Sequence, residues 1–522
     1  MKRISLATAH RRGAESADQR LFLFSFLLAF ALRMVRVGAR ALWYDEAFAV
    51  LYASLSPAQM IYGTVTPAGG SGAADVHPLL YYFLLHGWMK LAGHSPLAAR
   101  FLSVLLGVLT VALLTRLAVW CFDRRTGLVV GLLGALNPFH IAYSQEARMY
   151  ALLGLATVTA AWGLLRALGN EEARRDEATE SCSLPIVHWS LYVVSAALTL
   201  YAHNLGAPVL LALNLLAVTR RRWWRHLPRL LLADLLALIL FGPWLVAVLP
   251  GQVGFVGRGY WLTPPGPAEL LRAVMQPVLT LYEPAPMWVL TVGLFGGLLL
   301  LALLVLRAWR TRSRAGWFLL LWAMPIATLL LLSLWRPLFL ERALLPSALF
   351  YLVATGWLLA RGGLPRLLRY GLATLLTAAM IGSLVTHYTY AGFPRPPFAA
   401  VADYLHEHVG PDDVVVHTNK LTYFPLYTYA PELPAAFLAD RPGSPQDTLA
   451  YPTQQALGLF ASQTITAAVG PAERVWLIYF PREVEERGGA HPAMTWLEAH
   501  FVLVRQQPFS DLVVALYRRE RP

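Results

Sequence analysis

Long apolar stretches alternate with short polar segments over the first three quarters of the chain. A membrane-spanning helix needs about 20 predominantly apolar residues, and on that criterion we predict about eleven spans. Their centres lie near Leu28, Val108, Leu132, Thr157, Ser195, Ala212, Ala237, Phe295, Ala323, Val353 and Thr374. The stretch Leu79 to Leu91 is too short to span and predicts a helix at the membrane interface. The pattern predicts an α-helical polytopic membrane protein.

The pattern changes after Tyr390. A proline-rich linker, Pro394 to Pro397, leads into segments that alternate between helical and strand periodicity. The predicted helices are Phe398–Val409 and Pro492–His500, and the predicted strands are Asp413–His417, Arg474–Phe480 and Leu512–Tyr517. We therefore predict a tail over 1–20, a transmembrane domain over 21–390, and a small C-terminal α/β domain over 391–522.

The composition agrees with this class, because 57% of residues are hydrophobic and only 14% are charged. The net charge of +13 comes largely from arginines that fall in alternate loops. The positive-inside rule then predicts a cytoplasmic N-terminus and, after an odd number of spans, an extracytoplasmic C-terminal domain in a multi-pass plasma-membrane protein. A nucleic-acid partner is excluded, since the basic residues follow the topology and the C-terminal tail is mildly acidic.

The first apolar run has no small-residue cleavage site behind it, so we interpret it as an uncleaved signal anchor. The two cysteines, Cys121 and Cys182, both fall on the cytoplasmic side of this topology. They predict neither a disulfide framework nor a cysteine metal site.

Two acidic motifs carry the chemical signal. Asp45 and Glu46 directly follow the first span, and Glu146 lies with Tyr143 and Arg148 between two later spans, on the same predicted side. Acidic side chains at a membrane face are costly unless they meet water, a partner or a substrate, so each is a candidate functional residue. The plain alternatives are a solvated loop start for the first pair and an interfacial ion pair between Glu146 and Arg148.

Further polar residues are predicted on the same face: Asp75 and His77, Arg100, His140, Tyr201 and His203, Tyr282 and Glu283, Glu341 and Arg342. A carboxylate can take a proton from an acceptor hydroxyl, and arginine binds phosphate through paired hydrogen bonds. Arg100 could equally extend to the outer surface, as we expect of Arg33 and Arg36. Carboxylates and histidine are also ligands for a divalent cation, but no tight ligand spacing demands one, and metal dependence stays open.

The order of these motifs is similar to that of a known family. Residues 43–48 (WYDEAF), 77–82 (HPLLYY), 99–103 (ARFLS) and 137–150, ending in YSQEARMY, resemble glycosyltransferase family 39 of the GT-C superfamily. That family includes relatives of protein O-mannosyltransferases and lipid A aminoarabinose transferases. The resemblance covers Leu21 to Leu165 strongly and the rest of the membrane part loosely, including residues 336–346.

The resemblance implies inverting transfer of a sugar from a polyprenyl-phosphate donor to a lipid, glycan or protein acceptor at the outer face. Asp45 matches the acid regarded as the catalytic base, and Glu146 matches the acidic position of the second outer loop. Arg100 and Arg342 match arginines that hold the carrier phosphate, and His77 stands where relatives have histidine or lysine. Glu46 is taken with the catalytic acids, Arg148 with the phosphate-binding arginines, and Tyr143 and His203 with the substrate-binding residues.

Two departures weaken the protein-mannosylating branch: His77 is followed by one proline, and Ala343 replaces the usual tyrosine after Arg342. A lipid-linked glycan polymerase or ligase of another fold is the first alternative. A lipid or sugar transporter is the second, but transporters place their polar groups near the midplane of repeated halves, and no internal repeat is visible here. We expect the C-terminal α/β domain to shape the acceptor side.

Overall fold

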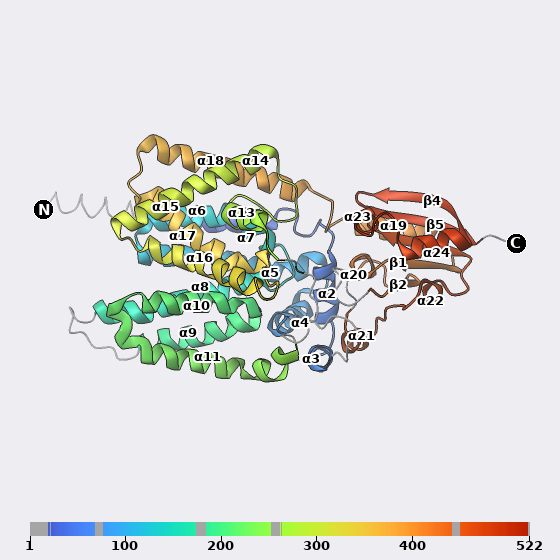
Figure 1. Cartoon of the computed structure of the whole chain (residues 1–522), viewed down its shortest axis with the longest axis horizontal. Helices are drawn as coiled ribbons and strands as arrows, with labels where there is room; N and C mark the ends of the chain where they lie inside the picture. The colour runs from blue at the N-terminus through green and yellow to red at the C-terminus, as the bar shows by residue number, and fades with distance from the viewer. Residues whose placement is uncertain are drawn as a thin grey trace. The chain divides into compact units, whose positions relative to one another are not determined.

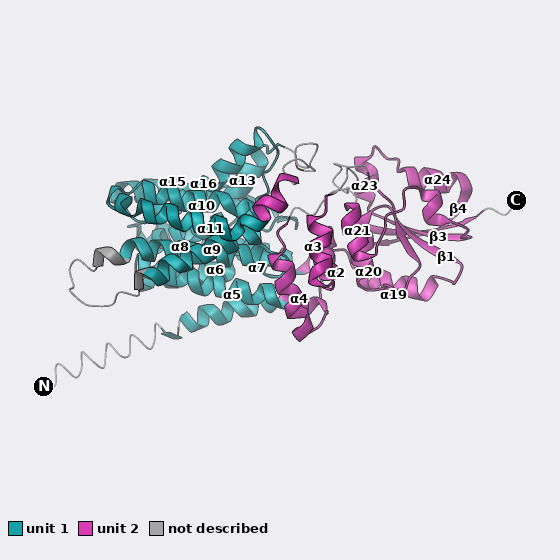
Figure 2. Ribbon diagram, turned by 90° about the horizontal axis from the view of Figure 1, so that it is seen from below, with its two compact units in different colours: residues 1–35, 101–243, 264–388 teal, residues 36–100, 244–263, 389–522 magenta. Residues whose placement is uncertain are grey.

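The computed structural model describes residues 19–20, 22–67, 77–173, 184–251, 262, 264–440 and 449–519. Asp75, Cys182 and most of the predicted tail lie outside the described residues. The chain divides into two compact units: unit 1 holds 1–35, 101–243 and 264–388, and unit 2 holds 36–100, 244–263 and 389–522 (Figure 2). Residues 36–100 thus fall in the same unit as the C-terminal residues, and the predicted domain boundaries stay a prediction.

Unit 1 is a bundle of long apolar helices (Figure 1). Its helices are Phe22–Met34, α5 (Pro96–Cys121, whose first turn belongs to unit 2), α6 (Arg124–Leu136), α7 (Pro138–Ser144), α8 (Tyr150–Ala173), α9 (Leu184–Ala202), η1 (Asn204–Gly206), α10 (Ala207–Val218), η2 (Arg221–His226), α11 (Leu227–Ala247, whose last turn belongs to unit 2), α13 (Pro267–Met275), α14 (Met287–Thr291), η3 (Val292–Gly296), α15 (Gly297–Thr311), α16 (Ala315–Ser333), η4 (Glu341–Leu344), α17 (Leu345–Arg361) and α18 (Arg366–Thr389).

These helices make the chain a multi-pass membrane protein. In the described residues, seven helices are long and apolar enough to span a bilayer, or eight if the bent pair α6–α7 is one span. Every predicted centre lies in an apolar helix, but the helices around Leu28, Ser195 and Ala212 have only 10–17 qualifying residues. The helical fold class is confirmed, and the count of eleven spans stays a prediction.

Helix α17 forms the centre of the bundle, and 94% of its span is buried, against 28% for the peripheral α11. Its Gly356 allows α6 to approach closely, since a Cβ at this position would lie 2.4 Å from a methyl group of Val130. The bend between α6 and α7 is 59° and falls at Asn137-Pro138, because proline cannot continue the hydrogen bonding of α6. Asn137 caps α7 by accepting a hydrogen bond from the His140 amide at 2.7 Å.

Unit 2 combines three helices of the first loop with the C-terminal α/β domain. The loop helices are α2 (Tyr44–Ala53), α3 (Pro57–Val65) and α4 (Leu80–Ala92). The domain elements are α19 (Phe398–His408), β1 (Asp413–His417), α20 (Lys420–Tyr427), β2 (Ala435–Phe437), α21 (Tyr451–Leu457), α22 (Ile465–Val469), β3 (Arg474–Tyr479), α23 (Pro481–Glu486), α24 (Pro492–His500), β4 (Phe501–Phe509) and β5 (Leu512–Arg519). Helix α4 confirms the short helix that was predicted there, and its place at the interface stays a prediction.

The sheet has the strand order β2-β1-β3-β5-β4, in which β2, β1 and β3 are parallel and β5 and β4 are antiparallel. Alternate residues of the central strands enter two separate cores. Val415 and Trp476 pack into one core with α19, whereas Val416 and Leu477 pack into the other with α24. This period-2 pattern with both faces covered is typical of an α/β domain, which confirms the predicted class.

Candidate active site

In unit 2, the adjacent acids of α2 have different surroundings. Glu46 is fully buried and forms a bidentate ion pair with Arg100, at 2.7 Å from Nε and 2.6 Å from Nη2. The Nε of Arg395 lies 3.8 Å from the same carboxylate. Asp45 is partly exposed and is not part of this pair. In the first turn of α2, Glu46 is therefore buried in an ion pair, whereas Asp45 is partly exposed.

Arg100 is 1% exposed, and its guanidinium is committed inside unit 2. Nη1 donates to the carbonyl oxygens of Val37 and Arg40, both at 2.7 Å, and Nη2 also donates to that of Ala41 at 2.8 Å. With the two bonds to Glu46, all five N–H groups of the guanidinium are used. This conformation leaves none for a lipid phosphate, and it favours a role for Arg100 in holding the segment before α2.

The C-terminal domain contributes to the surroundings of α2 within the same unit. The Lys420 ammonium lies 5.2 Å from the centre of the Tyr44 ring, and the Phe424 ring packs edge-on against Tyr44 at 5.9 Å. The hydroxyl of Tyr429 accepts a hydrogen bond from the amide of Leu42 at 2.9 Å. His77 lies at a bend before α4 and is half-buried.

In unit 1, three of the predicted site residues gather around Tyr150, which was not itself a predicted site residue. The Arg342 guanidinium stacks over the Tyr150 ring at 5.4 Å. Tyr143 and His203 pack against the same ring at 5.0 and 5.9 Å between centroids. All four side chains are buried, so this is a desolvated aromatic and cationic cluster in which charge interactions are strengthened.

Glu146 and Arg148 lie in the turn between α7 and α8, at 2% and 3% exposure. Tyr143 lies within electrostatic range of both Glu146 and Arg342. The carbonyl oxygen of Arg148 accepts a hydrogen bond from Ser103 at 3.4 Å, which ties the turn to α5. His203 also accepts from the amide of Leu205 at 3.0 Å and so caps η1.

One expectation about the arginines is wrong. Arg36 is exposed, but Arg33 is fully buried rather than extended to the outer surface. Its guanidinium donates to the carbonyl oxygens of Gly134 and Ala135, which the bend after α6 leaves without helical partners, and it contacts His140 Nδ1 at 2.8 Å. The carbonyl oxygens at the kinked end of α6 thus accept hydrogen bonds from the Arg33 guanidinium and stabilise it in the protein interior.

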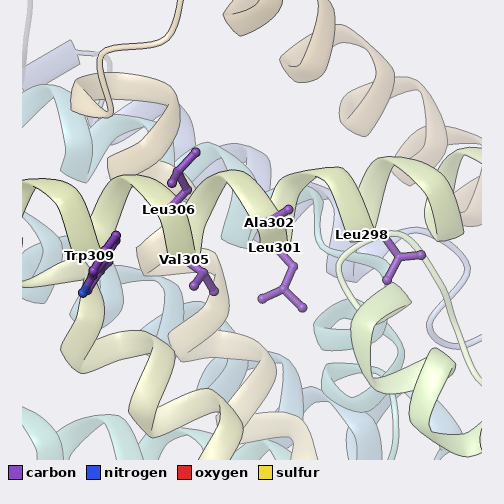
Figure 3. A pocket seen from close by; sticks show the side chains of 6 residues that line it. All are labelled: Leu298, Leu301, Ala302, Val305, Leu306 and Trp309. Carbon is purple, nitrogen blue, oxygen red and sulfur yellow. The ribbon is translucent and has the colours of Figure 1, made fainter.

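Two further features of the described residues bear on whether they form a metal site or a polar pocket. No three His, Cys, Asp or Glu side chains in the described part of the chain gather closely enough to hold a metal ion. A groove of 420 Å³ on α15 is lined only by the apolar side chains Leu298, Leu301, Ala302, Val305, Leu306 and Trp309 (Figure 3). It offers no group for acid–base catalysis or phosphate binding.

Comparison with known proteins identifies the fold. Residues 76–246 match the family described as dolichyl-phosphate-mannose-protein mannosyltransferase. ArnT from Cupriavidus metallidurans in the apo state is 14% identical with a TM-score of 0.61, and the match covers 96% of this chain and 98% of that chain. This chain is similar to family 39 of the GT-C glycosyltransferases. The resemblance read from the sequence is confirmed, and so is the fold class.

Two further solved structures share the fold. ArnT from the same organism bound to undecaprenyl phosphate is 14% identical, with a TM-score of 0.60 and coverage of 95% of this chain and 97% of that chain. The oligosaccharyltransferase AglB of Archaeoglobus fulgidus, in complex with an inhibitory peptide and a dolichol-phosphate, is 14% identical. Its TM-score is 0.50, and the match covers 97% of this chain and 75% of AglB. A search of curated proteins found no match.

Proposed function

We propose that this protein is a membrane glycosyltransferase that moves a sugar from a polyprenyl-phosphate carrier to an acceptor on the outer face. The observation that carries the proposal is the buried cluster of Arg342, Tyr143, Glu146 and Tyr150, in a chain with the GT-C fold over almost its whole length. The undecaprenyl phosphate bound to ArnT supports a lipid-phosphate donor, with a hexose or pentose as the sugar.

The reaction is a single displacement. The acceptor hydroxyl oxygen attacks the anomeric carbon on the face opposite the phosphate, and the bond from this carbon to the phosphate oxygen breaks. The phosphate leaves with the bonding electrons and stays on the lipid, and the general base takes the hydroxyl proton. One displacement inverts the anomeric configuration.

We assign the general base to Asp45. Glu46 is held by two charge-assisted hydrogen bonds from Arg100, and protonating it would leave a buried cation without its counter-charge. Asp45 sits on the same helical turn, is partly exposed, and lies outside that pair. Asp45 also lies in the first turn of α2, where the helix dipole interacts favourably with a negative charge.

We assign the carrier phosphate to Arg342 and Arg148, and Glu146, Tyr143, His77 and His203 to the surroundings of the sugar and acceptor. The position of the Arg342 guanidinium over the Tyr150 ring limits its movement, which favours a paired contact with a phosphate. Negative charge builds on the phosphate as the sugar leaves, so a fixed cation in a desolvated cluster stabilises the transition state more than the ground state.

The test is transfer of radiolabelled sugar from a polyprenyl-phosphate donor by the purified full chain. Asp45→Asn should lower turnover by roughly two to four orders of magnitude, as expected for loss of a general base, while the thermal midpoint stays that of the wild type. Near-wild-type turnover of this variant would remove Asp45 from the reaction and leave Glu146 as the base. If the wild type moves the donor across vesicles without transferring the sugar, the protein is a transporter.

A further inference from the structure

A chain of buried polar side chains joins three separated segments of unit 1. His387, near the end of α18, is fully buried, and its Nδ1 lies 2.8 Å from a carboxylate oxygen of Glu283. Its Nε2 lies 3.0 Å from Oε1 of Gln145, the first residue of the turn after α7. Gln145 directly follows α7 and His387 belongs to α18, and both helices are labelled in Figure 1. Gln145 lies inside the YSQEARMY motif, but neither it nor His387 was among the predicted site residues.

The buried face of α18 makes further contacts that hold His387, the central residue of this series, in place. Ser383 lies one helical turn before His387, and its hydroxyl accepts a hydrogen bond from the amide of Thr280 at 3.2 Å. Ser383 thus contacts Thr280 and His387 contacts Glu283, so that the segment from 280 to 283 is bound to α18 at both of its ends. Gly382 adds to this, because a Cβ there would lie 2.4 Å from the Trp288 ring.

The orientation of the Gln145 amide follows from its other partners. Its Nε2 donates to the carbonyl oxygens of Arg33 at 2.9 Å and Val35 at 2.8 Å. The reversed amide would set its oxygen against two carbonyl oxygens, so the amide cannot be flipped without losing both bonds. Oε1 therefore faces His387 as an acceptor, and His387 must donate from Nε2.

This assignment decides where the protons are. One proton is fixed on Nε2. The hydrogen bond between Nδ1 and the Glu283 carboxylate requires a second proton, which belongs either to the imidazole or to the carboxyl group. His387 and Glu283 thus share a proton and carry no net charge, which permits burial of both groups. Because Nε2 keeps its own proton, His387 always donates the hydrogen bond to Gln145 and never accepts it.

We propose that Glu283, His387 and Gln145 form a positioning relay that fixes the turn carrying Glu146 and Arg148 and the end of the helix that leads to Asp45. Gln145 is directly before Glu146, and its two acceptors, Arg33 and Val35, end the first helix. Tyr388 reinforces the same junction, since its hydroxyl donates to the Leu32 carbonyl at 2.6 Å. The kinetic part of this inference rests on the proposed function, because it assumes that these segments carry the reacting groups.

The first experiment compares turnover of relay variants with a matched exposed pair. His387→Phe and Glu283→Leu should lower kcat by about 10²-fold with little change in KM, since a small misplacement of catalytic groups has this effect. Glu283→Gln should recover most of the activity, because its amide can donate to Nδ1 of a neutral His387. His406 and Glu432 form an ion pair with side chains 41% and 61% exposed, so His406→Phe and Glu432→Leu should keep the wild-type kcat.

The second experiment does not depend on activity. Nitrogen-15 spectra of ring-labelled histidine in the full chain, assigned by difference with His387→Gln, should show a protonated Nε2 in wild type and in Glu283→Gln. Hydrogen exchange followed by mass spectrometry should show faster exchange in residues 143–149 of Glu283→Leu, and unchanged exchange in α10.

An unprotonated Nε2, or unchanged exchange in residues 143–149, would overturn the relay even where the wild type transfers sugar. If His387→Phe is recovered only as aggregate, Glu283→Leu gives the same test with the span intact. A wild type that transfers no sugar, yet shows the expected spectra and exchange, would overturn the proposed function and leave the relay as a structural device.

Discussion

Arg100 has two candidate roles: binding the carrier phosphate, which the family resemblance implies, and holding the segment before α2, which its contacts in the structure indicate. If Arg100 holds the carrier phosphate, a lysine should keep part of the affinity and the fold. If it holds the segment before α2, as its contacts indicate, a lysine should damage the fold first. Lysine brings three N–H donors where the guanidinium brings five, so at least two of the five acceptors lose their partner.

The magnitude follows from those acceptors. Each buried group left unsatisfied costs about 1–3 kcal/mol, so Arg100→Lys should cost roughly 2–6 kcal/mol. Glu46→Leu leaves a buried cation without its counter-charge and should cost about 3–5 kcal/mol. The double variant Glu46→Leu/Arg100→Met should recover only part of this loss, because the carbonyl oxygens of Val37, Arg40 and Ala41 still lack donors.

The assay is thermal unfolding of the purified full chain, measured together with binding of undecaprenyl phosphate. Arg342→Lys is the matched control, since Arg342 is also buried but stacks on Tyr150. Arg342→Lys should lower carrier affinity more strongly than it lowers the thermal midpoint. The reasoning would be refuted if Arg100→Lys kept the wild-type midpoint and lost carrier affinity, since Arg100 would then be the phosphate ligand.

Two further predictions concern the C-terminal domain. Burial lowers the pKa of His417 to about 3 from an ordinary value of 6.5. The unfolded chain therefore binds this proton first, so stability is complete above about pH 6.5 and falls by about 1.4 kcal/mol per unit as the pH drops toward 3. His417→Phe should flatten the decline in thermal midpoint, and an unchanged decline would show that other groups cause it. For topology, an alkaline phosphatase fused after Tyr390 should be active and a fluorescent protein that folds only in the cytoplasm should stay dark; the reverse pattern would place the domain inside.

The sequence predicted the regular elements whose periodicity decides their structure. Strand β1 and helix α24 have the predicted bounds, and β3 and β5 begin at the predicted residues. Strand β2 was missed because three residues, two of them alanine, carry almost no strand signal. Strand β4 was missed because it is an edge strand with a polar middle and a proline, so its two faces do not alternate.

The residues of the site were more predictable than their partners. The acids and arginines stood out because charge near a membrane face is costly. That Arg100 would bind Glu46, or that Arg342 would stack on Tyr150, depends on contacts between positions far apart in the chain, which a single sequence does not encode visibly. His387 gave a usable signal, since it and Ser383 are polar residues one turn apart within an apolar span. That spacing marks a helix face that packs on protein.

The packing of the first loop changes what the C-terminal domain can be expected to do. The sequence suggested a tethered module that shapes the acceptor side, but within unit 2 this domain supports the loop that carries Asp45. Thr453 donates to the Gly63 carbonyl oxygen at 2.9 Å, and Tyr429 accepts from the amide of Leu42 at 2.9 Å. The arginines proposed for the carrier phosphate belong to unit 1, whereas Asp45 belongs to unit 2. Loss of the domain would therefore remove the support of Asp45, the proposed general base, and spare the cluster proposed to bind the donor. Transfer would then fall for every acceptor alike, whereas loss of a module that shapes the acceptor side would affect the natural acceptor selectively.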